Sequence, residues 1–114
     1  MKFIKDAHKS AKENMQNVKL FNKEGIEKYS NGQLVDAQEM FEKALVIAPM
    51  NTGSALNLIQ VLIALVEKVP KKKWEFLERC KAVHKIVDGM PIAQAHQKRF
   101  EELTSKFEKL LNKK

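Results

Sequence analysis

Residues 20–49 read LFNKEGIEKYSNGQLVDAQEMFEKALVIAP, and they contain two helical segments separated by a turn. The first segment ends at Asn31-Gly32, a pair typical of a left-handed helix terminus. The second begins at Leu34 and carries apolar or small residues three and four positions apart until Pro49 closes it. The stretch therefore predicts a helical hairpin.

Small and aromatic residues alternate within this hairpin at spacings that suit a close helix contact. A glycine lies where two helices would approach, an aromatic residue follows one turn later, and a second glycine turns the chain. The second helix then has two alanines that permit close packing, an aromatic residue between them and a terminal proline. These seven positions are Gly25, Tyr29, Gly32, Ala37, Phe41, Ala44 and Pro49.

The series resembles a tetratricopeptide repeat, whose usual signature is small residue, aromatic, alanine, aromatic and terminal proline. The alternative is a helical hairpin that carries the same residues by coincidence. The resemblance implies an all-α scaffold of antiparallel hairpins in a short right-handed superhelix. It also implies a concave surface, lined by the first helix of each pair, that binds peptides or partner helices.

The rest of the chain is predicted to be helical as well. Residues 2–17 form a helix that is either separate from 18–30 or continuous with it, with Phe3, Ala7, Ala11 and Met15 on one face. Ser54 to Lys68 is apolar nearly all round, so it should lie in the middle of the stack. Further helices are expected at 72–87 and 92–111, and the short connections favour antiparallel neighbours.

Two prolines mark the expected connections in the second half. Pro70-Lys71-Lys72-Lys73 has the composition of an extended connection, and Pro91 is suited to the first turn of the last helix. We therefore expect a single domain, 1–114. It comprises a leading helix (1–17), a first repeat (18–51), a degenerate second repeat (52–89) and a capping helix (90–114), because short stacks need atypical terminal units.

A narrower resemblance involves three short runs, namely 20–25 (LFNKEG), 55–58 (ALNL) and 77–80 (LERC). They are similar to the carboxy-terminal repeat domain that follows the receiver in some bacterial two-component response regulators. The resemblance implies that the chain is the output half of a longer signalling protein, with no receiver of its own to be phosphorylated.

Charge and cysteine content limit the partners and the compartment. The net charge of +7 comes from nineteen lysines and two arginines against fourteen acids. It indicates either an ordinary solvated basic surface or one that attracts an acidic protein or nucleic acid. One cysteine, no recognisable signal peptide and an apolar stretch (55–66) too short for a membrane span predict a cytoplasmic protein without a membrane partner.

Candidates for chemistry are few. Cys80 and His84 lie four residues apart, where they could share a metal; the alternative is a small core cysteine beside a boundary histidine. No glycine-rich phosphate loop or nucleophile with an orienting third residue is evident. We therefore expect no catalytic, cofactor or metal site, and no enzyme.

The concave face supplies the candidate binding residues. Asn22, Ile26 and Tyr29 share one face of the first helix of the hairpin, and Asn57 and Gln60 lie on the matching face of the next pair. The aromatic and aliphatic side chains could equally be packing residues. Each amide could satisfy a buried backbone group or meet a ligand backbone.

The class of these domains that binds acidic chaperone tails has a lysine and an asparagine in the first helix. Asn22 and Ile26 occupy those positions here, which argues against that ligand.

Three functions follow as hypotheses. The first is a protein-interaction scaffold with a protein or peptide partner, such as the output domain of a signalling protein. The second is a basic helical protein that associates with nucleic acid. The third is a self-associating module, since a two-repeat array can close its core as a homodimer.

Overall fold

The computed structural model describes residues 2–112, with side chains from residue 11 onward, and these residues form helices and no strand. The prediction of an all-α protein is confirmed. Met1, Lys113 and Lys114, and the side chains of Phe3 and Ala7, lie outside this description. In chain order the elements are α1 (Lys2–Ser30), α2 (Leu34–Ile47), α3 (Thr52–Lys68), the 3₁₀ turn η1 (Pro70–Lys72), α4 (Lys73–Asp88) and α5 (Gln94–Asn112).

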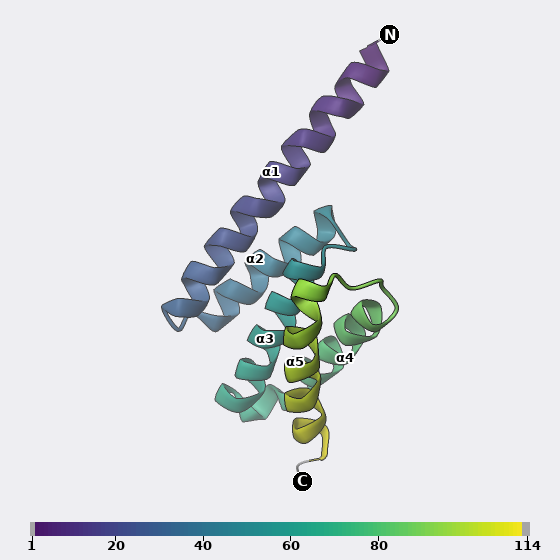
Figure 1. Cartoon of the computed structure of the whole chain (residues 1–114). Helices are drawn as coiled ribbons and strands as arrows, with labels where there is room; N and C mark the ends of the chain where they lie inside the picture. The colour runs from purple at the N-terminus through teal and green to yellow at the C-terminus, as the bar shows by residue number, and fades with distance from the viewer. Residues whose placement is uncertain (1, 113–114) are drawn as a thin grey trace.

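The first two helices form the expected hairpin. Residues 2–30 are one continuous helix, and α2 runs back along its carboxy-terminal half while the amino-terminal half extends beyond α2 (Figure 1). Gly32 makes the turn with φ of +79°, in the left-handed region that the sequence predicted. The Gln33 amide donates to the Lys28 carbonyl at 2.9 Å, which closes the end of α1.

Gly25 and Phe41 hold the two helices together. Gly25 is buried, and a Cβ atom built on it would lie 2.6 Å from Cζ of the Phe41 ring. Phe41 is 2 % exposed, and Ala37 and Ala44, one turn away on either side, are fully buried. The ring of Phe41 therefore occupies the space that the missing glycine side chain leaves, whereas the sequence had assigned the space beside Gly25 to Tyr29. The close helix contact that the sequence predicted at Gly25 is present.

Helix α3 lies at the centre of the molecule, as its all-round apolar character predicted. It packs against α1, α2, α4 and α5, and Asn51 caps its start by accepting a hydrogen bond from the Ser54 amide at 2.9 Å. Its buried residues are Ser54, Ala55, Leu56, Leu58, Ile59, Val61, Leu62, Ile63, Leu65 and Val66.

The connection from α3 to α4 differs from the prediction. Residues 70–72 form a 3₁₀ turn rather than an extended segment, and α4 begins at Lys73. The Val69 amide donates to the Leu65 carbonyl at 2.8 Å and the Lys72 amide donates to the Val69 carbonyl at 3.0 Å, so the backbone keeps helical hydrogen bonds on both sides of Pro70.

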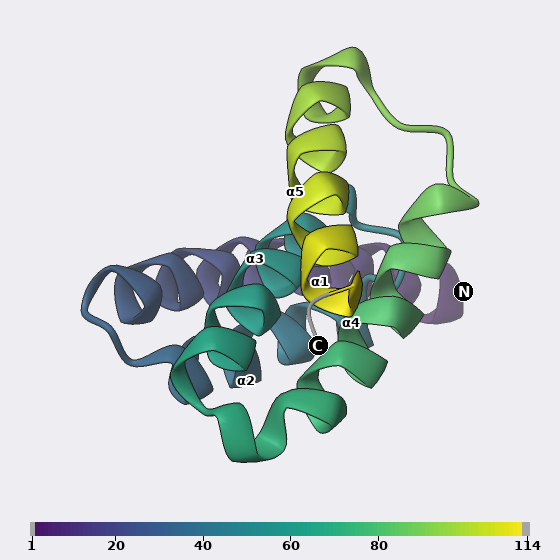
Figure 2. The ribbon, with the colours of Figure 1, turned by 90° about the horizontal axis from the view of Figure 1, so that it is seen from below.

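The chain turns by 118° between Thr52–Lys68 and Pro70–Asp88. The expectation of an antiparallel neighbour is therefore wrong for this pair, whose helices cross obliquely (Figure 2).

The last helix packs back onto α3 and α4. Phe100, Leu103, Phe107 and Leu110 are buried along one stripe of this helix. However, Pro91 does not open the helix, which starts only at Gln94. Two residues ahead of the helix pack into the core: Met90 is 8 % exposed, and Ile92 packs against the buried cluster. Because these contacts fix the backbone of residues 90–92, the helix begins only after them.

Within residues 2–112 no single helix has the length and apolar character of a membrane span, although α3 and the following bent segment 70–88 meet these criteria when taken together.

Candidate partner-binding groove

Four of the five predicted groove residues line one cavity. Ile26 and Tyr29 of α1 and Asn57 and Gln60 of α3 surround a space of about 230 Å³. Its remaining walls are Phe41, Val61 and a residue that sequence reasoning missed, Arg99 of α5. Ile26 is 52 % exposed, so the cavity opens to solvent at that side.

Arg99 binds the side-chain amides of Asn57 and Gln60, two polar residues of the otherwise apolar helix α3. Its Nη2 donates to Oδ1 of Asn57 and to Oε1 of Gln60, both at 2.7 Å. The expectation that each amide meets either a buried backbone group or a ligand backbone is therefore wrong for these two oxygens. The only hint of this role in the sequence is that Arg99 is one of two arginines among nineteen lysines and directly precedes the stripe residue Phe100.

Asn22 lies beside the cavity and not in its wall. Its Nδ2 donates to the Ser54 hydroxyl at 2.8 Å, and that hydroxyl donates in turn to Oδ1 of Asn51 at 2.9 Å. Asn57 Nδ2 lies 3.5 Å from Asn22 Oδ1, a long contact at the limit of a hydrogen bond. Polar contacts thus run from the α3 cap through α1 to Arg99, and they tie together three helices that line the groove.

The cavity continues into a second hollow. A space of about 250 Å³ shares Tyr29 and Gln60 with the first and extends to Glu67 of α3 and Lys106 of α5. Successive turns of α3 line the two spaces, through Asn57, Gln60, Ala64 and Glu67. The two spaces therefore form one groove of about 15 Å along that helix. We call this the α3/α5 groove.

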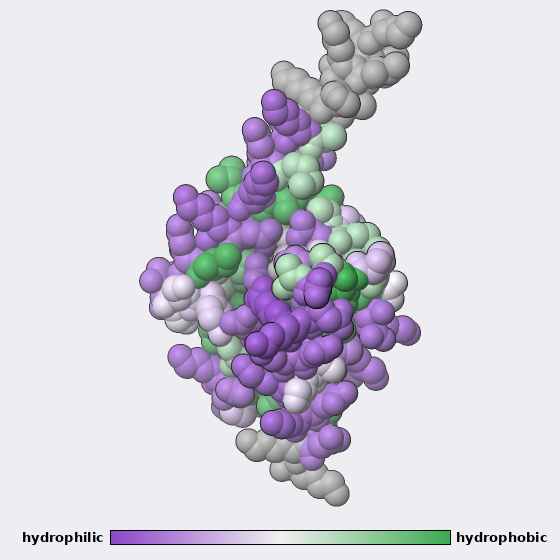
Figure 3. Space-filling view, viewed as in Figure 1, coloured by the Kyte–Doolittle hydropathy of each residue, from purple (hydrophilic) through white to green (hydrophobic). Residues whose placement is uncertain are grey.

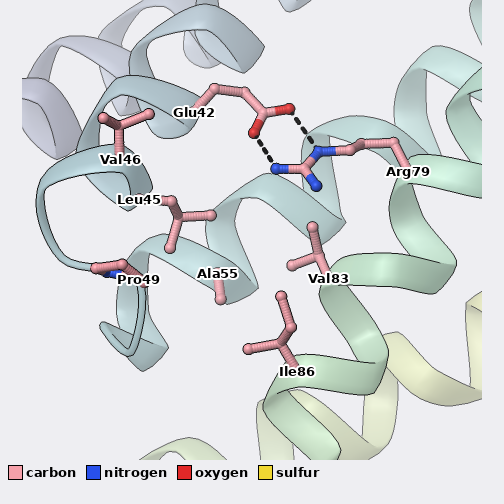
Figure 4. Close-up of a pocket in the computed structure, with 8 residues that line it drawn as sticks. All are labelled: Glu42, Leu45, Val46, Pro49, Ala55, Arg79, Val83 and Ile86. Atoms are coloured by element: carbon pink, nitrogen blue, oxygen red, sulfur yellow. Dashed lines mark hydrogen bonds and ion pairs between the residues drawn. The ribbon is translucent and has the colours of Figure 1, made fainter.

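A different pocket of about 230 Å³ lies between α2, α3 and α4. Figure 4 shows the aliphatic side chains of Leu45, Val83 and Ile86 around it, with Glu42 and Arg79 at its edge. Arg79 donates to both carboxylate oxygens of Glu42, with Nε to Oε2 at 2.9 Å. The charges at this pocket are therefore already paired with each other.

The surface shown in Figure 3 is mainly hydrophilic, with smaller apolar patches between polar side chains. Exposed large apolar residues are distributed over several helices and the turn between α2 and α3, and they include Met15, Leu20, Val35, Val46, Met50 and Trp74.

Cys80 and His84 are packing residues in this structure. Cys80 is 1 % exposed, and burial raises the pKa of its thiol to about 12. Nε2 of His84 lies 2.9 Å from the Thr104 hydroxyl, and the ring stacks on Phe100 at 5.0 Å. Cys80 therefore belongs to the buried core, and His84 contributes to the α4–α5 contact.

The raised pKa of Cys80 predicts a loss of stability in alkali. Above pH 9 the unfolded chain gains a thiolate that the folded chain cannot form until about pH 12, so unfolding becomes easier as pH rises through this window. We expect the wild type to lose about 1.4 kcal/mol between pH 8 and pH 10 relative to Cys80→Ala. Urea unfolding at both pH values measures it. Equal pH dependence in the two proteins would mean that the thiol ionises in the folded state.

These features define a class of protein: a small all-helical body with an open groove that carries one arginine and neutral amides. No protein-family model matches the chain, and no curated protein or solved structure shows a significant match to it.

Proposed function

We propose that the protein is a non-catalytic interaction scaffold of the tetratricopeptide type, which binds a short segment of a partner protein in the α3/α5 groove. The observation that supports it most is that residues of α1 and α3, such as Tyr29 and Gln60, are far apart in the sequence but line one open cavity with largely apolar walls. Such a groove is formed before binding, so little ordering cost falls on the scaffold. Placement as the output domain of a response regulator is a narrower proposal, which rests on the sequence resemblance alone.

The groove favours a segment of limited length. About 15 Å accommodates roughly four or five residues of extended chain. Apolar walls at Ile26, Phe41 and Val61 suit an aliphatic or aromatic side chain, while Tyr29 and Gln60 lie where the two hollows meet and can contact the backbone. The surrounding lysines would speed association more than they strengthen the complex, so added salt should slow binding and leave dissociation nearly constant.

The test is photo-cross-linking in cells of the source organism. A photoreactive amino acid placed at Ile26 or Ala64 should capture a protein partner, whereas one at Val46, which lines the pocket between α2, α3 and α4, should not. The affinity of the captured partner is then measured with Tyr29→Ala and Asn57→Ala. Ile86→Ala, in the pocket between α2 and α4, is the matched control, and circular dichroism checks that each variant is folded.

We expect the two groove variants to weaken binding roughly tenfold or more, as for central contacts of an interface, and Ile86→Ala to leave it unchanged. Loss of binding with Ile86→Ala alone would move the site to the other pocket. Capture of nucleic acid with a steep salt dependence would favour the basic-protein alternative. Capture of a second copy, with a dimer mass by light scattering, would favour self-association.

A further inference from the structure

Arg99 is held in the groove by one end of its guanidinium group. A single nitrogen, Nη2, makes both hydrogen bonds to the amide oxygens of Asn57 and Gln60. A guanidinium group has five N–H donors, so the bonds to the two amides leave donors of the same group available at the cavity.

Among the residues whose side chains are described, no acidic side chain forms an ion pair with Arg99. Ion pairs in the described part of the chain include Lys43–Glu39 and Arg79–Glu42, whereas the two acceptors of Arg99 are neutral. Burial lowers the pKa of Arg99, whereas Glu42 raises that of Arg79. A half-buried cation without a counter-charge is costly, and a ligand anion would remove that cost.

The cavity around Arg99 limits what the anion can be attached to. The space of about 230 Å³ that Arg99 lines accommodates one side chain beside the guanidinium. Ile26, Phe41 and Val61 form apolar walls next to the guanidinium. The matching group is a carboxylate with an apolar neighbour.

The groove also indicates where in a chain this carboxylate lies. Arg99 is near one end of the α3/α5 groove, but the cavity is open at Ile26 on one side and continues past Tyr29 and Gln60 on the other. A segment can thus pass Arg99 on both sides, which fits an acidic side chain within a chain better than a chain end.

We propose that Arg99 is the receptor for the carboxylate of an internal Asp or Glu in the partner segment, with an adjacent apolar residue in the cavity beside it. This inference rests on the proposed function, because it names the chemistry that the same groove recognises. The net charge of +7 acts in the same direction by attracting acidic segments from a distance.

The probe is a pair of pentapeptides, acetylated and amidated, of sequence Ser-Leu-Glu-Leu-Ser and Ser-Leu-Gln-Leu-Ser. Binding to ¹⁵N-labelled protein is followed by NMR, including the side-chain Nε–H signal of Arg99. We expect the Glu peptide to bind roughly tenfold tighter than the Gln peptide, the usual gain of a charge-assisted hydrogen bond. The Arg99 signal should shift with the Glu peptide.

Three variants separate the role of Arg99 from general charge. Arg99→Gln should bind the two peptides equally, and Arg99→Lys should retain part of the preference because it keeps a charge without the planar donor fork. Arg79→Gln, which removes the same charge from the α2–α4 side, should keep the full preference.

Equal binding of the two peptides by the wild type, a preference that survives in Arg99→Gln, or no binding of either peptide at millimolar concentration would overturn the proposal. Stronger binding of a peptide with a free carboxy terminus and no Glu would overturn the internal position and assign the site to a chain end. None of these results decides whether the groove binds a partner segment, because the cross-linking and the Tyr29→Ala variant test that proposal separately.

Discussion

Gly25→Leu is expected to destabilise the protein by at least about 1–3 kcal/mol, because its side chain enters space that the Phe41 ring already fills. Even the first added carbon would lie 2.6 Å from Cζ of Phe41 and 2.8 Å from Cδ1, well inside the 3.5–4.0 Å at which carbon atoms attract. Phe41 cannot move away freely, since it is 2 % exposed. Thermal unfolding followed by circular dichroism measures the loss.

Gly25→Ala tests the same contact more finely. Alanine is favoured over glycine inside a helix by about 1 kcal/mol, so the clash with Phe41 must exceed this gain for the variant to be less stable, and we expect that it does. Gly53→Ala is the matched control: the added carbon there would lie 3.5 Å from Oδ1 of Asn51, an ordinary contact, so this variant should be as stable as the wild type or more stable.

A double-mutant cycle assigns the effect to the ring. Phe41→Leu should cost less stability in the Gly25→Ala background than in the wild type, because it relieves the overlap. If Gly25→Leu melts with the wild type, the register of α1 against α2 is not the one described above.

Leu62→Ala is the second substitution with a large expected effect, about 2–5 kcal/mol. Leu62 is fully buried in α3, which contacts each of the other α-helices, so the surroundings can collapse onto the missing methyl groups only in part. The loss should appear as a single cooperative transition at lower urea concentration with an unchanged slope.

Val46→Ala provides the comparison for Leu62→Ala. It also shortens an aliphatic side chain inside a helix, but Val46 is 81 % exposed, so its stability should change by no more than about 0.5 kcal/mol. A biphasic transition for Leu62→Ala would contradict a central role of α3 and indicate that the α1–α2 hairpin unfolds independently.

Most helix boundaries could be predicted because their causes are local. Gly32 and Pro49 end helices through their own backbone preferences, and the ends of α1 and α2 lie within two residues of these positions. The start of α5 could not be predicted in the same way. It depends on Met90 and Ile92, which are held against a core built from other helices.

The candidate groove was predictable only in part. Helical spacing placed Ile26 and Tyr29 on one face and Asn57 and Gln60 on another, and the packing of α1 against α3 brings both faces to one cavity. The sequence contained no local sign of what the amides bind. Their partner lies 39 and 42 residues away along the chain.

The amino-acid sequence by itself determined that the chain is helical, where its first hairpin turns and that residues 54–68 form the centre of the core. These properties follow from side-chain periodicity and backbone preferences within a few residues. Only the tertiary structure decided that α4 crosses α3 obliquely and that α5 brings Arg99 to the amides of α3. The reason is that packing between helices far apart in the sequence depends on how side chains interlock across their contact, and no short stretch of the chain encodes that geometry.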